Sequence, residues 1–189
     1  FKNSTFIGSR TGIGDSAFVH SSESDSITLE EINFTNYTNH IYFQSNFQTE
    51  YIIRNTDLNY SNVVPGYGFA RFITQHLALI NLTDILGNPI SGAVEIVDKD
   101  FNISNPPVIE TINTNPSAHV FVATNESGIA EVFLTEEMDI KRAFSPLQTD
   151  NAKFDPYVLT ARSKGLAETA TINFTAVNST IRVNIPLDF

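Results

Sequence analysis

The sequence predicts an all-β protein with a short stacked-coil or sheet segment followed by a β-sandwich. Two observations predict this fold class. Residues 1–64 contain a faint internal repeat, and residues 76–189 contain apolar stretches at regular spacing with Gly, Pro, Asn and Asp turn signals between them. A chain of 189 residues is long enough for one sandwich of about 100 residues and a second unit of about 75.

The repeat in the first segment aligns residues 1–6, 29–34 and 53–58, with spacings of 28 and 24 residues. Each copy has an apolar strand, a polar residue near the corner and a Ser/Thr/Asn-rich turn such as 21–26. Periods of this length indicate coils that bury a continuous core only by stacking. The segment resembles the last coils of a pectate-lyase-type right-handed parallel β-helix of microbial surface proteins. An ordinary antiparallel sheet is the alternative.

A stack of two or three coils has open ends, which expose apolar side chains and unpaired backbone groups. Missing upstream coils, the following domain or the next subunit of an assembly would have to cover them. The next residues, 65–75, include Pro65, Gly66 and Gly68, which break strand patterning and predict a short, stiff linker.

Residues 82–96 open the second unit as strand, tight turn and strand, which predicts a β-hairpin. The pattern Asp84, Gly87, Pro89, Ile90, Gly92 and Ala93 resembles the opening of carboxypeptidase-regulatory-like modules of bacterial and archaeal surface proteins. The resemblance continues through 124–134 and 157–161, and implies an immunoglobulin-like sandwich over 76–189 that serves as a spacer or binding unit. We expect strands near 76–83, 92–99, 107–112, 118–124, 129–134, 156–163, 168–175 and 179–187. Residues 135–155 depart from the pattern and predict a short helix or loop.

The formal net charge is −10 and only 11 residues are Lys or Arg, so nucleic acid and anionic membrane are excluded as partners. The absence of cysteine excludes a disulfide scaffold, a zinc ribbon and a thiol nucleophile. No apolar run is long enough for a membrane span. The first residue is Phe1 rather than Met, which indicates a processed product or part of a longer protein.

Nine Asn-x-Ser/Thr sequons are present, whereas random order of the same residues would give roughly 3.5. This excess predicts an exported, N-glycosylated chain whose sugars solvate a surface that is poor in charge. Most of the sequons lack the acidic residue two positions earlier that bacterial N-glycosylation generally requires, which favours an archaeal or eukaryotic origin. The predicted sites are Asn3, Asn33, Asn36, Asn59, Asn81, Asn102, Asn125, Asn173 and Asn178.

Three groups of residues are candidates for a site of chemistry. Asp98, Asp100, Asn102 and Ser104 alternate like calcium ligands, but the Gly and final carboxylate of a calcium loop do not follow. The four histidines, His20, His40, His76 and His119, lack the close spacing of a metal site. Glu30, Glu31 and Asp57, with Arg54 nearby, are arranged somewhat like carboxylates of β-helix lyases, but the segment is too short for a substrate groove. We therefore predict no catalytic, cofactor-binding or metal-binding residues.

Together these features predict an extracellular, glycosylated structural protein that builds a cell-surface filament, sheath or surface layer. Subunits would associate through the strand-rich edges at 1–6 and 181–189 to form a homo-oligomer or polymer. A module for adhesion to carbohydrate or cells is the alternative, and a partial polysaccharide lyase is a third hypothesis.

Overall fold

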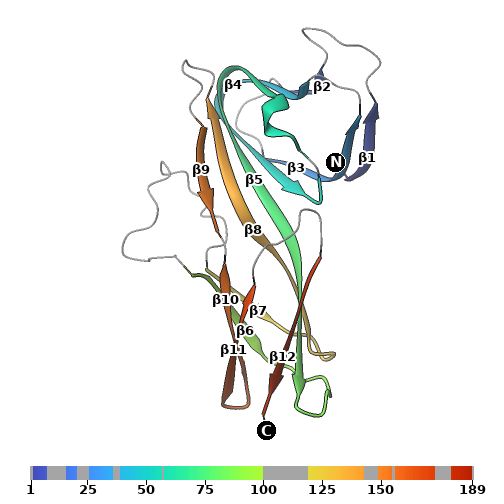
Figure 1. Cartoon of the computed structure of the whole chain (residues 1–189), viewed down its shortest axis with the longest axis vertical. Helices are drawn as coiled ribbons and strands as arrows, with labels where there is room; N and C mark the ends of the chain where they lie inside the picture. The colour runs from blue at the N-terminus through green and yellow to red at the C-terminus, as the bar shows by residue number, and fades with distance from the viewer. Residues whose placement is uncertain are drawn as a thin grey trace. The chain divides into compact units, whose positions relative to one another are not determined.

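The computed structural model describes residues 2–7, 16–20, 26–35, 39–56, 58–99, 119–142, 149–154, 156–172 and 180–188. This part of the chain is almost entirely strand, which confirms the all-β prediction (Figure 1). No helix in it is long and apolar enough to cross a membrane. The elements are β1 (Lys2–Ile7), β2 (Ser16–His20), β3 (Ser26–Thr35), β4 (Asn39–Arg54), the short 3-10 helix η1 (Tyr60–Asn62), β5 (Val63–Asp84), β6 (Ala93–Asp98), β7 (His119–Ala123), β8 (Ile129–Arg142), β9 (Thr149–Lys153), β10 (Tyr157–Ser163), β11 (Leu166–Ile172) and β12 (Ile181–Leu187).

The chain forms two compact units. Unit 1 contains Phe1–Gln75 and Glu137–Ala152, and unit 2 contains His76–Glu136 and Lys153–Phe189. Two long strands contribute to both, because β5 and β8 each cross a unit boundary along the sequence.

Unit 1 is built from parallel strand pairs, which are β1 with β3, β3 with β4, β2 with β4, and β4 with β5. The registers agree with the sequence repeat: Lys2 pairs with Glu30 at a spacing of 28, and Glu30 pairs with Arg54 at a spacing of 24. The pairing is therefore parallel, which rules out an ordinary antiparallel sheet for these strands and agrees with the expectation of stacked coils.

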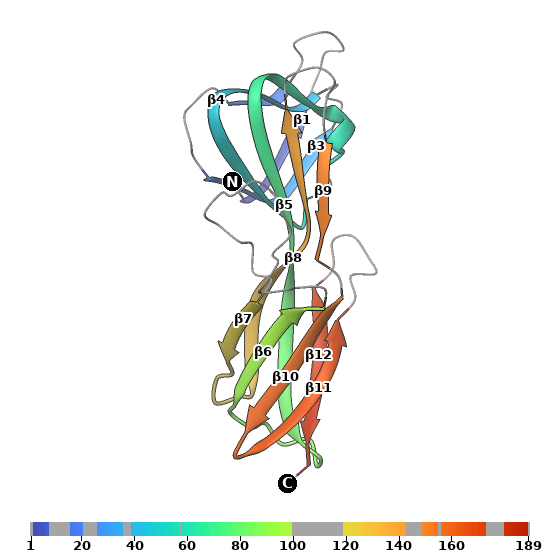
Figure 2. The ribbon, with the colours of Figure 1, turned by 90° about the vertical axis from the view of Figure 1, so that its left-hand side faces the viewer.

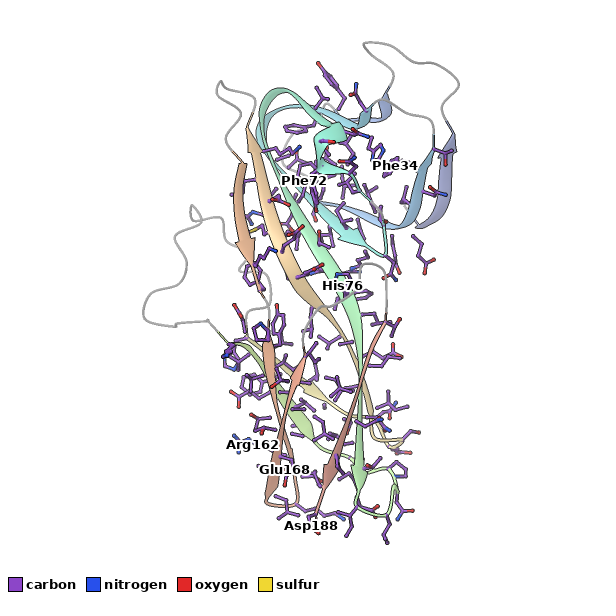
Figure 3. All side chains as sticks on the ribbon, in the orientation of Figure 1. Phe34, Phe72, His76, Arg162, Glu168 and Asp188 are labelled. Atoms are coloured by element: carbon purple, nitrogen blue, oxygen red, sulfur yellow. The ribbon has the colours of Figure 1, made fainter. Side chains whose placement is uncertain are left out.

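In the core of unit 1, side chains of similar chemistry lie at paired positions of neighbouring strands. Tyr51 pairs with Phe72 in register, and their rings stack with centroids 4.8 Å apart and an interplanar angle of 5°. Both side chains are fully buried, and burial raises the pKa of Tyr51 above its ordinary value. Phe72 lies in the interior of the unit in Figure 3. The stack therefore gains its stability from a ladder of apolar side chains that continues from strand to strand.

The corners of successive coils share a backbone conformation. Glu31 and Asn55 occupy equivalent repeat positions, and both have positive φ, 55° and 46°. Thr56 follows the second corner, and its buried hydroxyl accepts from Ile32 N at 3.0 Å. The same hydroxyl lies within hydrogen-bond distance of Leu29 O, at 3.3 Å. One threonine thus ties consecutive coils together at the corner.

Residues 65–75, expected to form a linker, lie inside β5. The pairing of β4 with β5 steps from Pro65 to Tyr67 and from Tyr67 to Phe69 on the β5 side. Gly68, at one skipped position, has φ of 84°. Bulges of this kind accommodate Gly and Pro within a strand. The residues that suggested a break therefore bend a continuous strand.

Residues 135–155 were expected to form a short helix or loop, and this expectation was wrong for the described residues 135–142 and 149–153, which are strand. Residues 135–142 continue β8, and β9 follows it in the same sheet. Met138 and Ile140 are buried at alternate positions, as a strand requires, and the intervening Asp139 is also buried. Residues 138–141 are all buried, so this part of β8 lacks the alternation of buried and exposed side chains by which a strand is predicted.

Unit 2 is a sandwich. One layer contains the unit 2 parts of β5 and β8 with β12, and the other is a four-stranded sheet in the order β11-β10-β6-β7 (Figure 2). Antiparallel pairing joins the four strands of the second layer. The core between the layers contains Ile80, Leu82, Val94, Ile96, Leu134, Tyr157, Leu159, Ile185 and Leu187, all buried. Every strand predicted in 76–189 has a counterpart except 107–112, which lies outside the described residues.

The turn after Asp84 was expected to close a β-hairpin, but β5 and β6 belong to different sheets. The predicted tight turn with Gly is present, because Gly87 N donates to Asp84 O at 3.0 Å and Gly87 has φ of 86°. The two sides of the turn pair only briefly, through a bridge between Thr83 and Pro89 with backbone hydrogen bonds from Asp84 N to Asn88 O at 2.9 Å and from Ile90 N to Leu82 O at 3.1 Å. The chain therefore uses this turn to pass from one layer of the sandwich to the other.

Candidate functional site

The first candidate feature is the edge formed by β1. Among the described strands, β1 pairs only with β3 and stands at the end of the strand order β1-β3-β4-β5-β8-β9. A strand at the edge of a sheet presents unpaired N–H and C=O groups to a further strand. The β1 edge therefore offers a backbone surface for β-augmentation.

The opposite side of the stack is covered within the chain. There, β8 follows β5 and β9 ends the sheet. Lys141 of β8 is buried, and its ammonium group donates to the carbonyl oxygens of Tyr60 and Val63 at the end of η1. Burial lowers the pKa of Lys141, and the nearby Asp139 opposes this effect. Sequence reasoning missed this contact, because the charged residues around Met138 and Ile140 suggested an exposed helix or loop.

The C-terminal edge, expected at 181–189 as a second surface for pairing, is used within the chain. Strand β12 pairs in parallel with β5, with Ile181 opposite Ala78 and Leu187 opposite Asp84. Ile185 and Leu187 are buried. Residues 181–187 therefore complete the sandwich of unit 2.

Three predicted glycosylation sites lie at exposed positions of the described chain: Asn33, Asn59 and Asn125. In each, the carboxamide oxygen accepts from the residue two positions later. Asn33 Oδ1 accepts from Thr35 Oγ1 at 3.5 Å, and Asn59 Oδ1 accepts from Ser61 N at 3.0 Å. Asn125 Oδ1 accepts from Ser127 N at 2.9 Å. The amide nitrogen, to which a sugar would be attached, takes no part in these bonds.

Asn81 differs from these three because it lies within β5 and is half-buried. Its Nδ2 donates to Asn184 Oδ1 of β12 at 3.3 Å. Asn3 lies in β1, opposite the Glu31 corner in the alignment of the repeat. The remaining predicted sites, Asn36, Asn102, Asn173 and Asn178, lie outside the described residues.

The four histidines lie on four different strands. His20 lies in β2, and His40 is buried with its ring stacked on Phe34 at 4.6 Å. His76 is buried and contacts Glu136 at 2.7 Å, whereas His119 is exposed on β7. Within the described ranges, no group of three or more His, Cys, Asp or Glu residues could hold a metal ion. Of the alternating oxygen ligands, Asp98 is buried at the end of β6, and 100–104 are outside these ranges.

The carboxylates of the first segment belong to a ladder of paired positions. Glu30 lies opposite Lys2 on one side and Arg54 on the other, and Arg54 Nε donates to Gln75 Oε1 at 3.0 Å. Burial lowers the pKa of Arg54, and the charge of Glu30 opposes this effect. Glu31 is exposed at its corner, and Asp57 lies outside the described residues. The described side chains thus pair across the coils as structural partners.

Sequence reasoning did not identify the outer face of the four-stranded sheet. Glu95 lies opposite Phe121 of β7 on one side and Thr160 of β10 on the other. Its carboxylate contacts His119 Nε2 at 2.9 Å and Arg162 Nη2 at 3.7 Å, and Arg162 extends away from the strands of unit 2 in Figure 3. Phe121 is 68% exposed. The alternation of 119, 121 and 123 would have placed these residues on one face.

The turn after β5 exposes two aliphatic side chains, Ile85 and Leu86, at 61% and 82%. Asp84 fixes this turn, because its carboxylate accepts from Leu86 N at 2.9 Å and from Asn88 N and Nδ2 at 2.8 Å. The hydrogen bonds from Asn88 lower the pKa of Asp84 below its ordinary value. A pair of apolar side chains is thus held at a rigid turn.

No family model and no curated protein matches the sequence. Two solved structures align with part of the chain at 12% identity. A catechol 1,2-dioxygenase of Acinetobacter radioresistens aligns with a TM-score of 0.38 over 75% of this chain and 57% of that chain. The major pilin subunit of Bacillus cereus aligns with a TM-score of 0.32 over 66% of this chain and 31% of that chain. At these TM-scores neither similarity indicates a shared function.

Proposed function

We propose that this chain is an extracellular, N-glycosylated structural protein whose copies assemble at a cell surface through the β1 edge. The observation that carries the proposal is the asymmetry of the stack in unit 1. The parallel strands β1, β3, β4 and β5 are followed by β8 on the β5 side, whereas no described strand follows them on the β1 side. The strand β9 also ends the sheet, but it lies outside this parallel stack. A strand from a second copy would extend the sheet there and form a filament, sheath or surface layer.

Two observations support N-glycosylation. The sequence contains more sequons than random order would give, and Asn33, Asn59 and Asn125 are exposed. An exported protein with a low charge count gains solubility from such sugars. We propose an archaeal source, a chain without catalytic activity or cofactor, and assembly without nucleic acid.

Proline substitution in β1 tests the assembly. Alternate residues of an edge strand direct their N–H groups to opposite sides, so one of the neighbours Ser4 and Thr5 donates toward β3 and the other away from it. We expect one of Ser4→Pro and Thr5→Pro to keep the native circular dichroism spectrum and to sediment as a monomer. The unchanged protein would sediment as larger species at the same concentration. Both variants assembling as well as the unchanged protein would overturn the proposal.

An adhesion module for carbohydrate or cells is the alternative, and the rigid turn with Ile85 and Leu86 favours it. Two exposed aliphatic side chains on a fixed turn would contact a partner at little entropic cost. Ile85→Ser with Leu86→Ser would then abolish binding of the purified chain to cells and leave sedimentation unchanged. Loss of sedimenting assemblies instead would assign this turn to the assembly.

A further inference from the structure

An exposed aromatic ring lies close in sequence to a sequon that has a fixed geometry. Phe121 is the one aromatic among the four strongly exposed large apolar side chains of the described residues, the others being Ile85, Leu86 and Ile129. It lies on β7, and Asn125 follows that strand by two residues. The positions 119, 121, 123 and 125 are all exposed.

The turn after β7 holds Asn125 in one orientation. Its Oδ1 accepts from two backbone donors, Ser127 N at 2.9 Å and Ile129 N at 3.0 Å. Asn125 N donates to Ile129 O at 2.9 Å, and Gly128 N donates to Asn125 O at 2.9 Å. The carboxamide oxygen is therefore turned toward the turn, and Nδ2 lies on the other side of the group.

Asn125 lies four positions after Phe121, so their Cα atoms are at most about 14 Å apart. Two or three linked sugars attached to Nδ2 span a comparable length. The apolar C–H face of a sugar packs well on an aromatic ring, because the contact removes apolar surface of both groups from water. The face of the ring also carries partial negative charge, which attracts the C–H groups. Glu95, opposite Phe121 in register, presents a carboxylate that accepts hydrogen bonds from sugar hydroxyls.

We propose that Asn125 carries an N-linked glycan whose inner sugars run back along β7 and cover the ring of Phe121. The inference rests on the glycosylation proposed above, and it assigns that sugar a contact on the protein. Attachment joins Asn125 Nδ2 to the anomeric carbon of a sugar on a lipid-linked phosphate donor. The bond between that carbon and the phosphate oxygen breaks, and the amide proton leaves with the phosphate. No oxidation or reduction is involved.

The test uses the full chain, produced in a host that installs N-glycans, with and without the sugar on Asn125. Ser127→Ala removes the sequon but keeps the backbone N–H that holds Asn125, so the turn is preserved. Thr35→Ala, which removes the sequon at Asn33, is the matched control. Glycopeptide mass spectrometry gives the occupancy of each site, and denaturant unfolding gives the stability of each variant.

With Phe121 present, loss of the sugar by Ser127→Ala should raise the unfolding equilibrium constant roughly two- to tenfold. In a Phe121→Ala background, removal of the sugar by Ser127→Ala should leave the unfolding equilibrium constant unchanged. In a Phe121→Tyr background, the same removal should again raise the constant, because Tyr also presents a ring. Sugar proton resonances should also shift upfield only when a ring occupies position 121. Equal effects of Ser127→Ala with and without the ring would overturn the contact.

The outcomes separate this inference from the proposed function. Sugar on Asn33 and Asn59 with a bare Asn125 would overturn the inference and leave the glycoprotein proposal standing. Bare asparagines at every sequon, in protein taken from the native cells, would overturn both.

Discussion

The two units bury their apolar side chains in different ways. In unit 1, parallel strands place like residues side by side, as with Leu29 and Ile53 or Tyr51 and Phe72. In unit 2, two sheets face each other and the core between them is closed by both layers. A stack can be extended by any strand that continues the ladder, whereas the two layers of a sandwich cover each other's apolar faces. The need for a covering partner therefore belongs to unit 1.

The largest expected effect breaks the aromatic ladder of unit 1. Phe72 is fully buried, stacks on Tyr51, and meets Tyr60 edge-on with centroids 5.9 Å apart. Phe72→Ala should lower the free energy of unfolding by about 3–5 kcal/mol. Hydrogen exchange should quicken at the amides of Leu29 and Ile53. A loss below about 1 kcal/mol would show that the ladder does not hold the stack together.

The matching substitution in unit 2 acts through a backbone contact. A Cβ at Gly128 would lie 2.4 Å from Leu82 O, and Gly128 has φ of 73°. Gly128→Ala should therefore lower the free energy of unfolding by about 1–3 kcal/mol. Gly87→Ala is the control, because Gly87 also has positive φ but has no atom within 4 Å of the added Cβ. Equal losses would show that φ alone, rather than the close approach, requires Gly128.

Thr56→Val tests the tie between coils at nearly constant volume. The change removes the hydroxyl that accepts from the amide of Ile32 and leaves this amide without that acceptor. The expected loss is about 1–3 kcal/mol, measured by denaturant unfolding. Thr135→Val, at a buried threonine of unit 2, allows the two units to be compared. A neutral Thr56→Val would mean that the corner is held by packing alone.

The smallest expected effect on stability comes from substitutions at two residues of positive φ, one in each unit. Glu31 at a coil corner and Lys164 in the β10–β11 turn have φ of 55° and 48°. Asn and Gly adopt such conformations at lower cost. Glu31→Asn and Lys164→Asn should each stabilise the protein by up to about 1 kcal/mol in thermal unfolding. Destabilisation by Glu31→Asn alone would show that the Glu31 side chain supports the stack.

The sequence predicted much of this fold because its repeats and turns are local signals. The alignment of residues 1–6 with 29–34 and 53–58 coincides with the strand registers, since in stacked coils equivalent residues become neighbours. The strands of 76–189 were predicted from alternation and turn residues. Local patterns failed where distant contacts decide the structure. Residues 65–75 stay in β5 because β4 pairs along them, and Asp139 and Lys141 are buried in a strand despite their charge.

The candidate site was predicted less completely. The sequence names sequons by motif, but only the structure distinguishes exposed Asn33, Asn59 and Asn125 from Asn81, whose amide pairs with Asn184 from more than 100 residues away. The pairing of β12 with β5 was not predicted, because the two strands are distant in sequence. Local composition predicts where a strand ends, but it does not predict which distant strand pairs with it.

Electron cryo-microscopy of the native material, as it leaves the cell, tests the central proposal most directly. We expect repeating subunits in which a strand of the neighbouring copy pairs with β1, with density for sugar on Asn33, Asn59 and Asn125. Isolated particles with β1 facing solvent and bare asparagines would contradict the account.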